Sequence, residues 1–318
     1  MSKEPVTHSL KPTPQTVHWG HFDAALPPVL KIASGDRVQV ETVTGLPEQM
    51  PQSGFTVPAD VQAIHATHKP YLGPHILCGP VWVEGAQPGD VLQVDIESVA
   101  CREDWGFNLI APLRGSLPED FPEGRLLHIP IDRKRGVATM SWGTEIKLSP
   151  FWGIMATAPR KSYGRVSSIQ PREYGGNMDN KELVAGSTLY LPVFNEGALF
   201  SIGDGHGVQG DGEVCLTALE TFLTGTVRLT VRKDLGLKFP RAETPTHYIT
   251  MGMDEDLDDA AKQALRDMLK LLQEKAGLSA HDAYTLCSLA CDMRITQLVD
   301  GNKGVHAIIS KEMAKGKK

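Results

Sequence analysis

The sequence predicts an α+β protein in which β-strands dominate and helices are confined to the C-terminal end. Many short runs alternate between apolar and polar residues, which is the pattern of a strand with one buried face. The 31 Gly and 22 Pro residues separate these runs with turns. Apolar residues at helical spacing appear only after about residue 250. We therefore expect a β-rich body over residues 1–248 and a helical α+β portion over 249–318.

The composition is that of a globular protein with an ordinary hydrophobic core. The chain has 318 residues, of which 41% are hydrophobic and 22% charged, and its formal net charge is −6. The acidic balance argues against a nucleic-acid partner, and no apolar run is long enough to cross a membrane. Five scattered cysteines and a polar N-terminal stretch favour the cytoplasm, where thiols stay reduced.

The first strands are predicted by strict alternation. Residues 36–43, 90–97 and 226–233 each place apolar side chains on one face and polar side chains on the other. Residues 188–194 and 197–202 are more continuously apolar, which favours strands that are covered on both faces.

The C-terminal portion begins with a long amphipathic segment. Residues 254–277 carry acidic residues in the first turn, apolar residues at helical spacing and Gly277 at the expected end. Residues 279–282 form a capping-box-like start for a second helix, which we expect to run to about Asp292 or beyond. Residues 304–310 predict a last strand.

The stretch "FSIGDGHGVQGDGEV" (residues 200–214) contains five glycines among metal-capable side chains, namely Asp204, His206, Asp211 and Glu213. Its "GHGVQG" matches a dinucleotide-binding fingerprint literally, but strand-forming residues follow where that motif needs a helix. The calcium-binding loop of an EF-hand requires carboxylates at other spacings and a helix on each side. We interpret the stretch as a metal or polar catalytic site on a loop held by an apolar strand. The alternative is that the glycines and aspartates merely build two tight turns.

Other candidates lie outside this stretch. Asp179 follows a Gly-Gly bend and is either a site residue or part of an exposed turn. Cys215 is either a nucleophile or a buried strand thiol, since Val214 and Leu216 flank it. Residues 106–124 predict a long loop that closes a site or contacts another chain.

Several segments together resemble the acetamidase/formamidase family. "GGNMDNKELVAGSTLYLPVFNEGALFSIGDGHGVQGDGEVCLTALE" follows the most distinctive stretch of that family, and "GPVWVEGAQPGDVLQVDI", "PFWGIMATAP" and "LSAHDAYTLCSLACDMRITQLVD" resemble three more. The resemblance extends from about Pro28 onward. It departs from the common pattern at Trp152, Ala156-Thr157 and residues 75–78, which we expect to shape the substrate pocket.

The resemblance implies a fold, a reaction and a cofactor. The fold would be a β body of barrel and sandwich parts with a C-terminal α+β portion. The reaction would be hydrolysis of small aliphatic amides of the formamide or acetamide type to a carboxylate and ammonia, and some relatives open lactams instead. A divalent metal, zinc first and calcium as the alternative, accompanies some members, and a homo-oligomer is expected.

These expectations lead to a hypothesis about the roles of individual residues. Asp179, Asp204 and His206 would bind the metal ion, because carboxylates and imidazole suit zinc or a harder divalent ion. Glu213 would carry the proton from water to the leaving nitrogen. Asp211 would orient His206 or a water molecule.

Two further site features and two rival functions complete the hypothesis. Glu41 matches a glutamate position of the relatives and is the weaker catalytic candidate, and the backbone amides of Gly205 and Gly207 would stabilise an oxyanion. One rival function is a Cys215-dependent amidase that forms an acyl-enzyme. The other is a non-catalytic β-sandwich module that binds a cation and a ligand.

Overall fold

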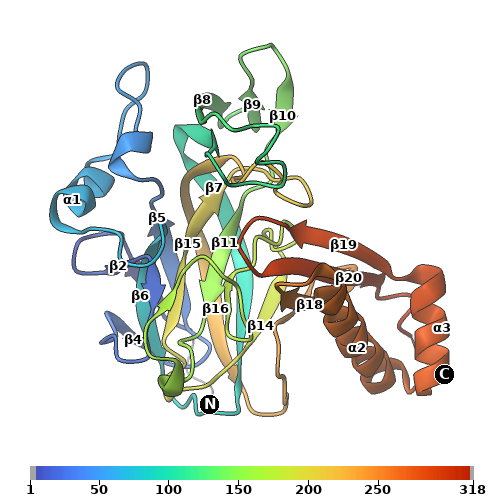
Figure 1. Cartoon of the computed structure of the whole chain (residues 1–318). Coiled ribbons are helices and arrows are strands. Elements are labelled where there is room, and N and C mark those ends of the chain that lie inside the picture. The colour runs from blue at the N-terminus through green and yellow to red at the C-terminus, as the bar shows by residue number, and fades with distance from the viewer. Residues whose placement is uncertain (1–4, 316–318) are drawn as a thin grey trace.

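The computed structural model describes residues 5–315, which form a β-sheet body with helices on two opposite sides (Figure 1). Helix α1 (Ala59–Thr67) lies on one side, and helices α2 (Leu257–Ala276) and α3 (Ala280–Ala290) lie on the other. The predicted class, α+β with a predominance of β and a helical C-terminal portion, is confirmed. The prediction that helices are confined to the C-terminal end is wrong, because α1 lies within the body.

The strands form two consecutive groups along the chain, one in the body and one in the C-terminal portion. The body contains β1 (Thr7–Leu10), β2 (Val17–Trp19), β3 (His21–Phe22), β4 (Leu30–Ile32), β5 (Arg37–Thr42), β6 (Ile76–Val83), β7 (Val91–Ile110), β8 (Arg125–Asp132), β9 (Val137–Thr139), β10 (Glu145–Lys147), β11 (Phe151–Ala156), β12 (Val166–Ser167), β13 (Gly175–Asn177), β14 (Thr188–Pro192), β15 (Phe200–His206), β16 (Glu220–Arg232) and β17 (Arg241–Glu243). The C-terminal portion contains β18 (His247–Asp254), β19 (Asp292–Gln297) and β20 (Lys303–Ser310). Short 3₁₀ helices span Pro47–Gln49 and Lys161–Tyr163.

The three alternating runs predicted from the sequence form the frame of the body. They lie in β5, β7 and β16, and β16 pairs antiparallel with both of the others. Along β16 the side chains of Val227 and Leu229 are buried, whereas those of Arg228 and Thr230 are partly exposed. The period of two therefore predicted both the strands and their buried face.

Strand β15 crosses the centre of the body, and all seven of its residues are buried. It pairs with β11 on one side and with β6 on the other, and its last residue pairs with β16. The glycine-rich stretch therefore begins as a strand rather than a loop, and Asp204 and His206 belong to that strand. The loop itself covers residues 207–219.

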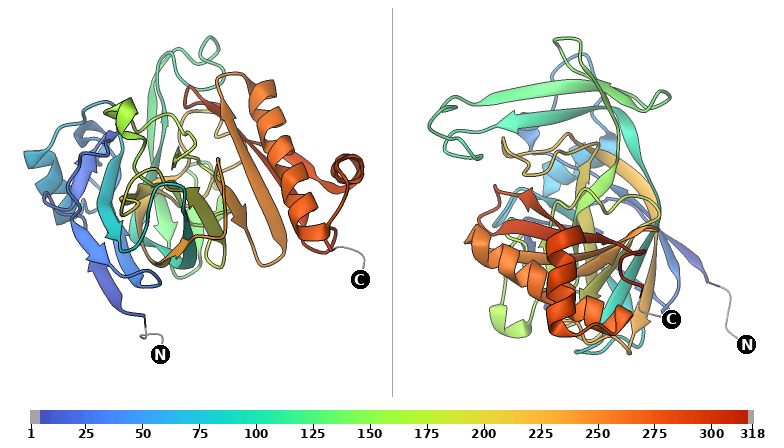
Figure 2. Two further views of the ribbon diagram at one scale, coloured as in Figure 1. Left: turned by 90° about the horizontal axis from the view of Figure 1, so that it is seen from below. Right: turned by 90° about the vertical axis from the view of Figure 1, so that its right-hand side faces the viewer.

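The C-terminal portion continues the sheet of the body. Strand β18 pairs with β17 and β20, and β19 pairs only with β20 among the described strands. Helices α2 and α3 lie along one side of these strands (Figure 2). The division at residue 248 stays a prediction, because the β17–β18 ladder runs across it.

The helix ends follow the sequence signals, with one error. Gly277 ends α2 in a left-handed conformation at φ 64°, and the Ser279 side chain accepts a hydrogen bond from the Asp282 amide at the start of α3. The predicted extension of the second helix to Asp292 is wrong, because α3 ends at Ala290 and Asp292 starts β19. Met293 and Ile295, which lie beyond that point, belong to this strand.

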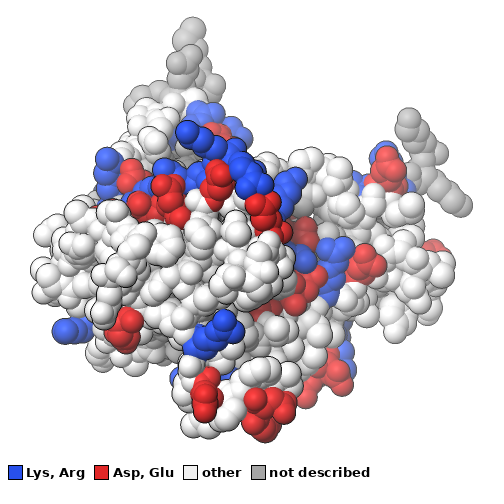
Figure 3. Space-filling view, turned by 90° about the horizontal axis from the view of Figure 1, so that it is seen from above, with Lys and Arg blue, Asp and Glu red and all other residues white. Residues whose placement is uncertain are grey.

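The surface carries both signs of charge. On the face shown in Figure 3, basic and acidic side chains lie side by side and much of the area is uncharged. Among residues 5–315, no helix combines the length and the apolar character that a membrane span requires.

Candidate active site

A buried acidic cluster surrounds one histidine at the floor of a cavity of about 290 Å³. Each member is at most 7% exposed, although carboxylates are rarely buried without a functional or structural reason. The members are Asp179, Asp204, His206, Glu213, Glu220 and Asp300. We refer to these six residues as the acidic cluster.

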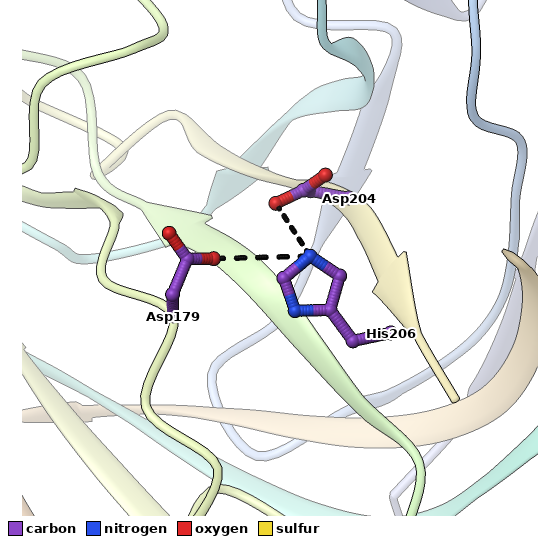
Figure 4. Close-up of side chains that lie close together, drawn as sticks. All are labelled: Asp179, Asp204 and His206. Carbon is purple, nitrogen blue, oxygen red and sulfur yellow. Dashed lines mark ion pairs between the residues drawn. The ribbon is translucent and has the colours of Figure 1, made fainter. Parts of the chain in front are cut away.

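Strand β15 contributes two members because they are two residues apart. Asp204 and His206 project to the same face of the strand, toward Asp179 (Figure 4). The two glycines that flank Asp204 lie very close to the backbones of the neighbouring strands. A Cβ atom on Gly203 would lie 2.6 Å from the carbonyl oxygen of Ile76, and one on Gly205 would lie 2.5 Å from that of Thr221. The glycines therefore allow the sheet to close around the side chains that form the site.

His206 is contacted by carboxylates from three elements. Its Nε2 atom lies 3.2 Å from Asp204 Oδ2, 3.1 Å from Glu220 Oε1 and 3.9 Å from Asp179 Oδ1. Glu220 reaches this position because it lies directly opposite His206 in the β15–β16 register. The ring also packs edge-on against Phe151 on β11, with ring centroids 5.0 Å apart.

Gln209 fixes the other side of the His206 ring. The Gln209 Nε2 atom donates to the backbone oxygens of Asp179 (2.7 Å) and Thr296 (3.4 Å), which leaves its Oε1 to accept from His206 Nδ1 at 3.0 Å. This network assigns the proton to Nδ1 and turns Nε2 toward the carboxylates. The orienting role expected of Asp211 is therefore filled by Gln209.

Asp179 lies beside Gly153 of β11, where there is no room for a side chain. A Cβ atom at position 153 would lie 2.3 Å from Asp179 Oδ1 and 2.4 Å from Asp204 Oδ2. Both carboxylate oxygens of Asp179 are buried without a hydrogen-bond partner in the described part of the chain. Such orphaned acceptors are costly, and they point to a ligand that belongs between the carboxylates.

Three members of the acidic cluster have left-handed backbone conformations that non-glycine residues rarely adopt. The φ angles are 47° at Asp179, 58° at Asp204 and 46° at Glu213. Each such conformation costs on the order of 1–3 kcal/mol, and such costs concentrate at functional sites. The surrounding sheet over-determines these conformations, which aim three carboxylates into one cavity.

The pKa values of His206 and of the two carboxyl groups nearest to it shift in different directions. Burial alone would lower the pKa of His206, but the charges of Glu220 and Asp204 raise it well above its usual value. Burial also opposes ionisation of Asp204, yet the charge of His206 leaves the pKa of Asp204 lowered. Burial raises the pKa of Glu220 to about 7, against the opposing effect of His206.

The remaining carboxyl groups favour the neutral form. Burial and the charge of Asp179 raise the pKa of Glu213 well above its usual value. Burial and the charges of Asp179 and Glu213 do the same for the pKa of Asp300. Burial likewise raises the pKa of Asp179, although His206 opposes it. Without added positive charge, the cluster therefore retains protons at neutral pH.

Sequence reasoning missed two acidic members and one neighbour. Glu220 opens β16, Asp300 lies in the turn between β19 and β20, and Asn177 lines the same cavity. These residues approach the site only through strand register and chain folding. His75 also lines the cavity, as expected from the departure from the family pattern at residues 75–78.

The turn that carries Asp300 is held by Gln297. Its Oε1 atom accepts from the amides of Val299 (2.9 Å) and Asp300 (3.1 Å), and its Nε2 donates to the Asn302 carbonyl at 2.7 Å. The Glu213 loop is joined to this segment by backbone bonds, from Gly212 to Thr296 and from Leu298 back to Gly212. The C-terminal portion thus forms one wall of the site.

The structure places two predicted catalytic residues away from the acidic cluster. Asp211 forms an ion pair with Lys181 at 3.0 Å and does not line the cavity. Glu41 pairs with Arg102 at 3.1 Å on the outer side of β5 and does not line it either. Asp211 belongs to a loop that turns away after Gln209, and Glu41 faces the side of its strand opposite the buried Val40.

Three other sequence expectations meet the structure as follows. The Cys215 thiol lies in a separate depression, where it contacts the Asn108 amide at 3.2 Å. Trp152 is fully buried and donates to Thr42 Oγ1, so it supports the wall rather than lining the cavity. The Gly207 amide donates to the Leu219 carbonyl at 2.8 Å and is therefore not an oxyanion donor.

Comparison with known proteins connects this site with a family. The model of the Acetamidase/Formamidase family matches residues 6–168 and 162–310. A formamidase of Methylophilus methylotrophus is 29% identical over 305 residues, which cover 76% of this chain and 73% of that protein. An acetamidase of Mycolicibacterium smegmatis is 31% identical over 198 residues, which cover 44% of this chain and 49% of that protein.

A solved structure agrees with the sequence matches. The crystal structure of an acetamidase from Yersinia enterocolitica superposes with a TM-score of 0.86 and 29% identity, covering 98% of this chain and 94% of that one. The family match extends over nearly the whole chain and includes every member of the acidic cluster. The chain therefore belongs to the acetamidase/formamidase family of amidohydrolases.

Proposed function

We propose that the chain hydrolyses small aliphatic amides of the formamide or acetamide type, with a divalent metal ion held by Asp179, Asp204 and His206. Membership of the family supports amide hydrolysis. The observation that carries the metal proposal is that both buried Asp179 oxygens lack a hydrogen-bond partner among the described residues, although Oδ1 lies only 3.9 Å from His206 Nε2. Zinc is the first choice of ion, and calcium is the alternative.

The donor set fits a small divalent ion. The ligand atoms of Asp179, Asp204 and His206 all lie within 4.8 Å of one another. Neighbouring ligands of a tetrahedral zinc ion are about 3.3 Å apart, and the distances from His206 Nε2 to the two aspartates are 3.2 and 3.9 Å. An ion would also compensate the buried negative charge of the cluster, and Gly153 leaves the necessary space.

The protein's own groups position and move protons. When bound, a divalent ion acts as a Lewis acid on a carbonyl and on water. Glu213, as a carboxylate, takes a proton from the attacking water while the water oxygen bonds to the amide carbon. Glu213 then gives that proton to the nitrogen as the carbon–nitrogen bond breaks, which releases ammonia and the carboxylic acid. The acid ionises by transferring its remaining proton to ammonia or to water.

The buried environment suits this proton transfer. Burial and the charge of Asp179 raise the pKa of Glu213, which strengthens the group as a base, and a cation bound beside it would favour its carboxylate form. Glu220, with a pKa of about 7, contacts His206 and keeps a second proton inside the cluster. Asn177 and His75 line the cavity and offer polar contacts to the carbonyl oxygen.

The first prediction tests the metal set. Asp204→Ala and His206→Ala should each abolish ammonia release from formamide and acetamide and lose the bound metal found by elemental analysis. Full activity of both variants after dialysis against a chelator would show that the metal proposal is wrong.

Glu213→Gln should lower kcat by about two to four powers of ten, and a change below threefold would remove Glu213 from the role of proton carrier.

The rival amidase receives less support. The hydrogen-bond partners of the Cys215 thiol among the described residues are Asn108 and Thr217, so no base contacts it to produce a thiolate. Alkylation of the thiols that leaves turnover intact would exclude a cysteine mechanism. Lactam opening stays a second candidate reaction. It gives an amino acid instead of ammonia, so a lactam is tested by measuring that amino acid.

A further inference from the structure

We propose that the preferred substrates are primary amides with an apolar acyl chain of about six carbons, rather than formamide or acetamide. This inference rests on the proposed amide hydrolysis and specifies its substrate class. It follows from the size of the cavity above the acidic cluster, the chemistry of its walls and the position of its single guanidinium group.

The cavity is larger than the smallest amides require. Its volume is about 290 Å³. Since one water molecule occupies about 30 Å³ in the liquid, the cavity holds roughly ten groups of that size. Formamide or acetamide would fill only the part next to the acidic cluster and would leave the rest to water. A six-carbon primary amide fills most of the volume and displaces that water.

Apolar side chains from separate segments of the chain make up much of the lining above the acidic cluster. They are Leu46, Phe107, Leu109, Ile169, Leu216 and Val299. Thr44, Gln49 and Thr217 add neutral polar groups to the same lining. An amide group placed at the acidic cluster would direct its acyl chain along these aliphatic and aromatic side chains. Burial of each methylene group there is favourable.

The lining is held in place, so these walls are part of the folded site. The Leu109 amide donates to Thr217 Oγ1 at 2.9 Å, which joins the end of β7 to the loop that carries Leu216. The Ser116 amide donates to the Val214 carbonyl at 2.9 Å and fastens the 111–124 loop to the same segment. These bonds connect Leu109 and the 111–124 loop to the segment that directly follows Glu213.

Charge disfavours an anionic acyl chain near the floor. Five of the six residues of the acidic cluster are carboxylic acids, and a carboxylate close to them would meet like charges in a buried setting. Arg114 lies at the exposed edge of the cavity lining, beyond the apolar wall. It is the one arginine or lysine in this lining and would favour a distal carboxylate, and the experiment includes a substrate that tests this.

The experiment measures kcat/KM for ammonia release from formamide, acetamide, butanamide, hexanamide and octanamide, and from the hexanamide analogue with a terminal carboxylate. We expect kcat/KM to rise about fourfold per methylene up to hexanamide and then to level off or fall. A maximum at formamide or acetamide, or a higher value for the carboxylate analogue, would overturn the inference. Ammonia release from none of the amides would instead overturn the proposed function.

Wall variants make the result specific to this cavity. Leu109→Trp fills part of the cavity and should lower the ratio of hexanamide to acetamide kcat/KM at least tenfold. Ile169→Phe narrows the cavity from a different segment of the chain and should also lower this ratio. Leu126→Ala is the matched control, because Leu126 lies opposite Leu109 in the β7–β8 ladder but does not line the cavity. A ratio unchanged by both wall variants, or changed equally by the control, would contradict the inference.

Discussion

At the scale of single residues, the candidate site depends on the absence of a side chain as much as on its carboxylates. Gly153 lies between Asp179 and Asp204, and its backbone oxygen accepts from the Asp179 amide at 3.2 Å. The two aspartates reach their positions only because nothing projects from the strand between them. A sequence signal for this role was lacking, since an isolated glycine in a strand has several explanations.

Gly153→Ala should therefore abolish metal binding and lower kcat/KM for acetamide at least a hundredfold, because the new methyl group would displace both carboxylates. Gly236→Ala is the matched control, since a Cβ atom there meets no atom within 4 Å. Metal content and activity are measured together on both folded variants. A Gly153→Ala enzyme that binds metal normally would show that the space beside Gly153 is not needed.

At the scale of secondary-structure elements, the sequence predicted strands well and their neighbours poorly. Alternation located β5, β7 and β16, but Asp204 and His206 were predicted on a loop, whereas they lie on one face of β15. Register cannot be read from a single strand, so the pairing of Glu220 with His206 was missed. For the same reason the outward side of β5, which carries Glu41, could not be distinguished from the side that faces the site.

A buried histidine also joins two elements beneath the site. His18 on β2 contacts Ser201 Oγ on β15 at 2.9 Å through Nε2, and its Nδ1 contacts the His21 carbonyl at 2.7 Å. Burial, together with the nearby His21, lowers the pKa of His18 from 6.5 to about 3. The folded state therefore holds this ring neutral, whereas the unfolded chain protonates it below about pH 6.5.

This difference predicts how stability depends on pH. The contribution of His18 is complete above pH 6.5 and is lost as the pH falls toward 3, because the unfolded state then binds the extra proton. Between pH 6.5 and 5, the free energy of unfolding should fall by about 1 kcal/mol per pH unit more in the wild type than in His18→Gln. Urea denaturation at several pH values measures both slopes.

The exposed His281→Gln variant is the control for loss of an imidazole, and it should keep the wild-type slope. Equal slopes for the wild type and His18→Gln would mean that His18 is not the group that titrates on unfolding.

At the scale of the whole molecule, the site is assembled from segments that are distant along the chain. The body supplies five members of the acidic cluster, and the turn between β19 and β20 supplies Asp300. The resemblance to relatives indicated the reaction and the Asp204–His206 pair, but it did not indicate Asp300. A contact between the C-terminal portion and the glycine-rich loop exists only in the folded chain, through backbone bonds such as that from Gly212 to Thr296.

The state of Asp300 can be tested by comparing two substitutions. Burial and neighbouring carboxylates raise the pKa of Asp300 well above its usual value, which favours the neutral carboxylic acid. Asp300→Asn preserves a neutral group of similar shape and should retain kcat/KM for acetamide within about tenfold. Asp300→Ala should lose about a hundredfold, since it opens the wall beside Asp179 and Glu213. Equal losses in both variants would show that Asp300 acts in its ionised form.

The late position of Asp300 has a consequence for biosynthesis. Translation proceeds from the N-terminus, so the segment that bears this residue leaves the ribosome after all other parts of the acidic cluster have been made. A prematurely terminated polypeptide would carry Asp204 and His206 yet lack one side of the pocket. We therefore expect full activity toward an amide only after the last strands have docked.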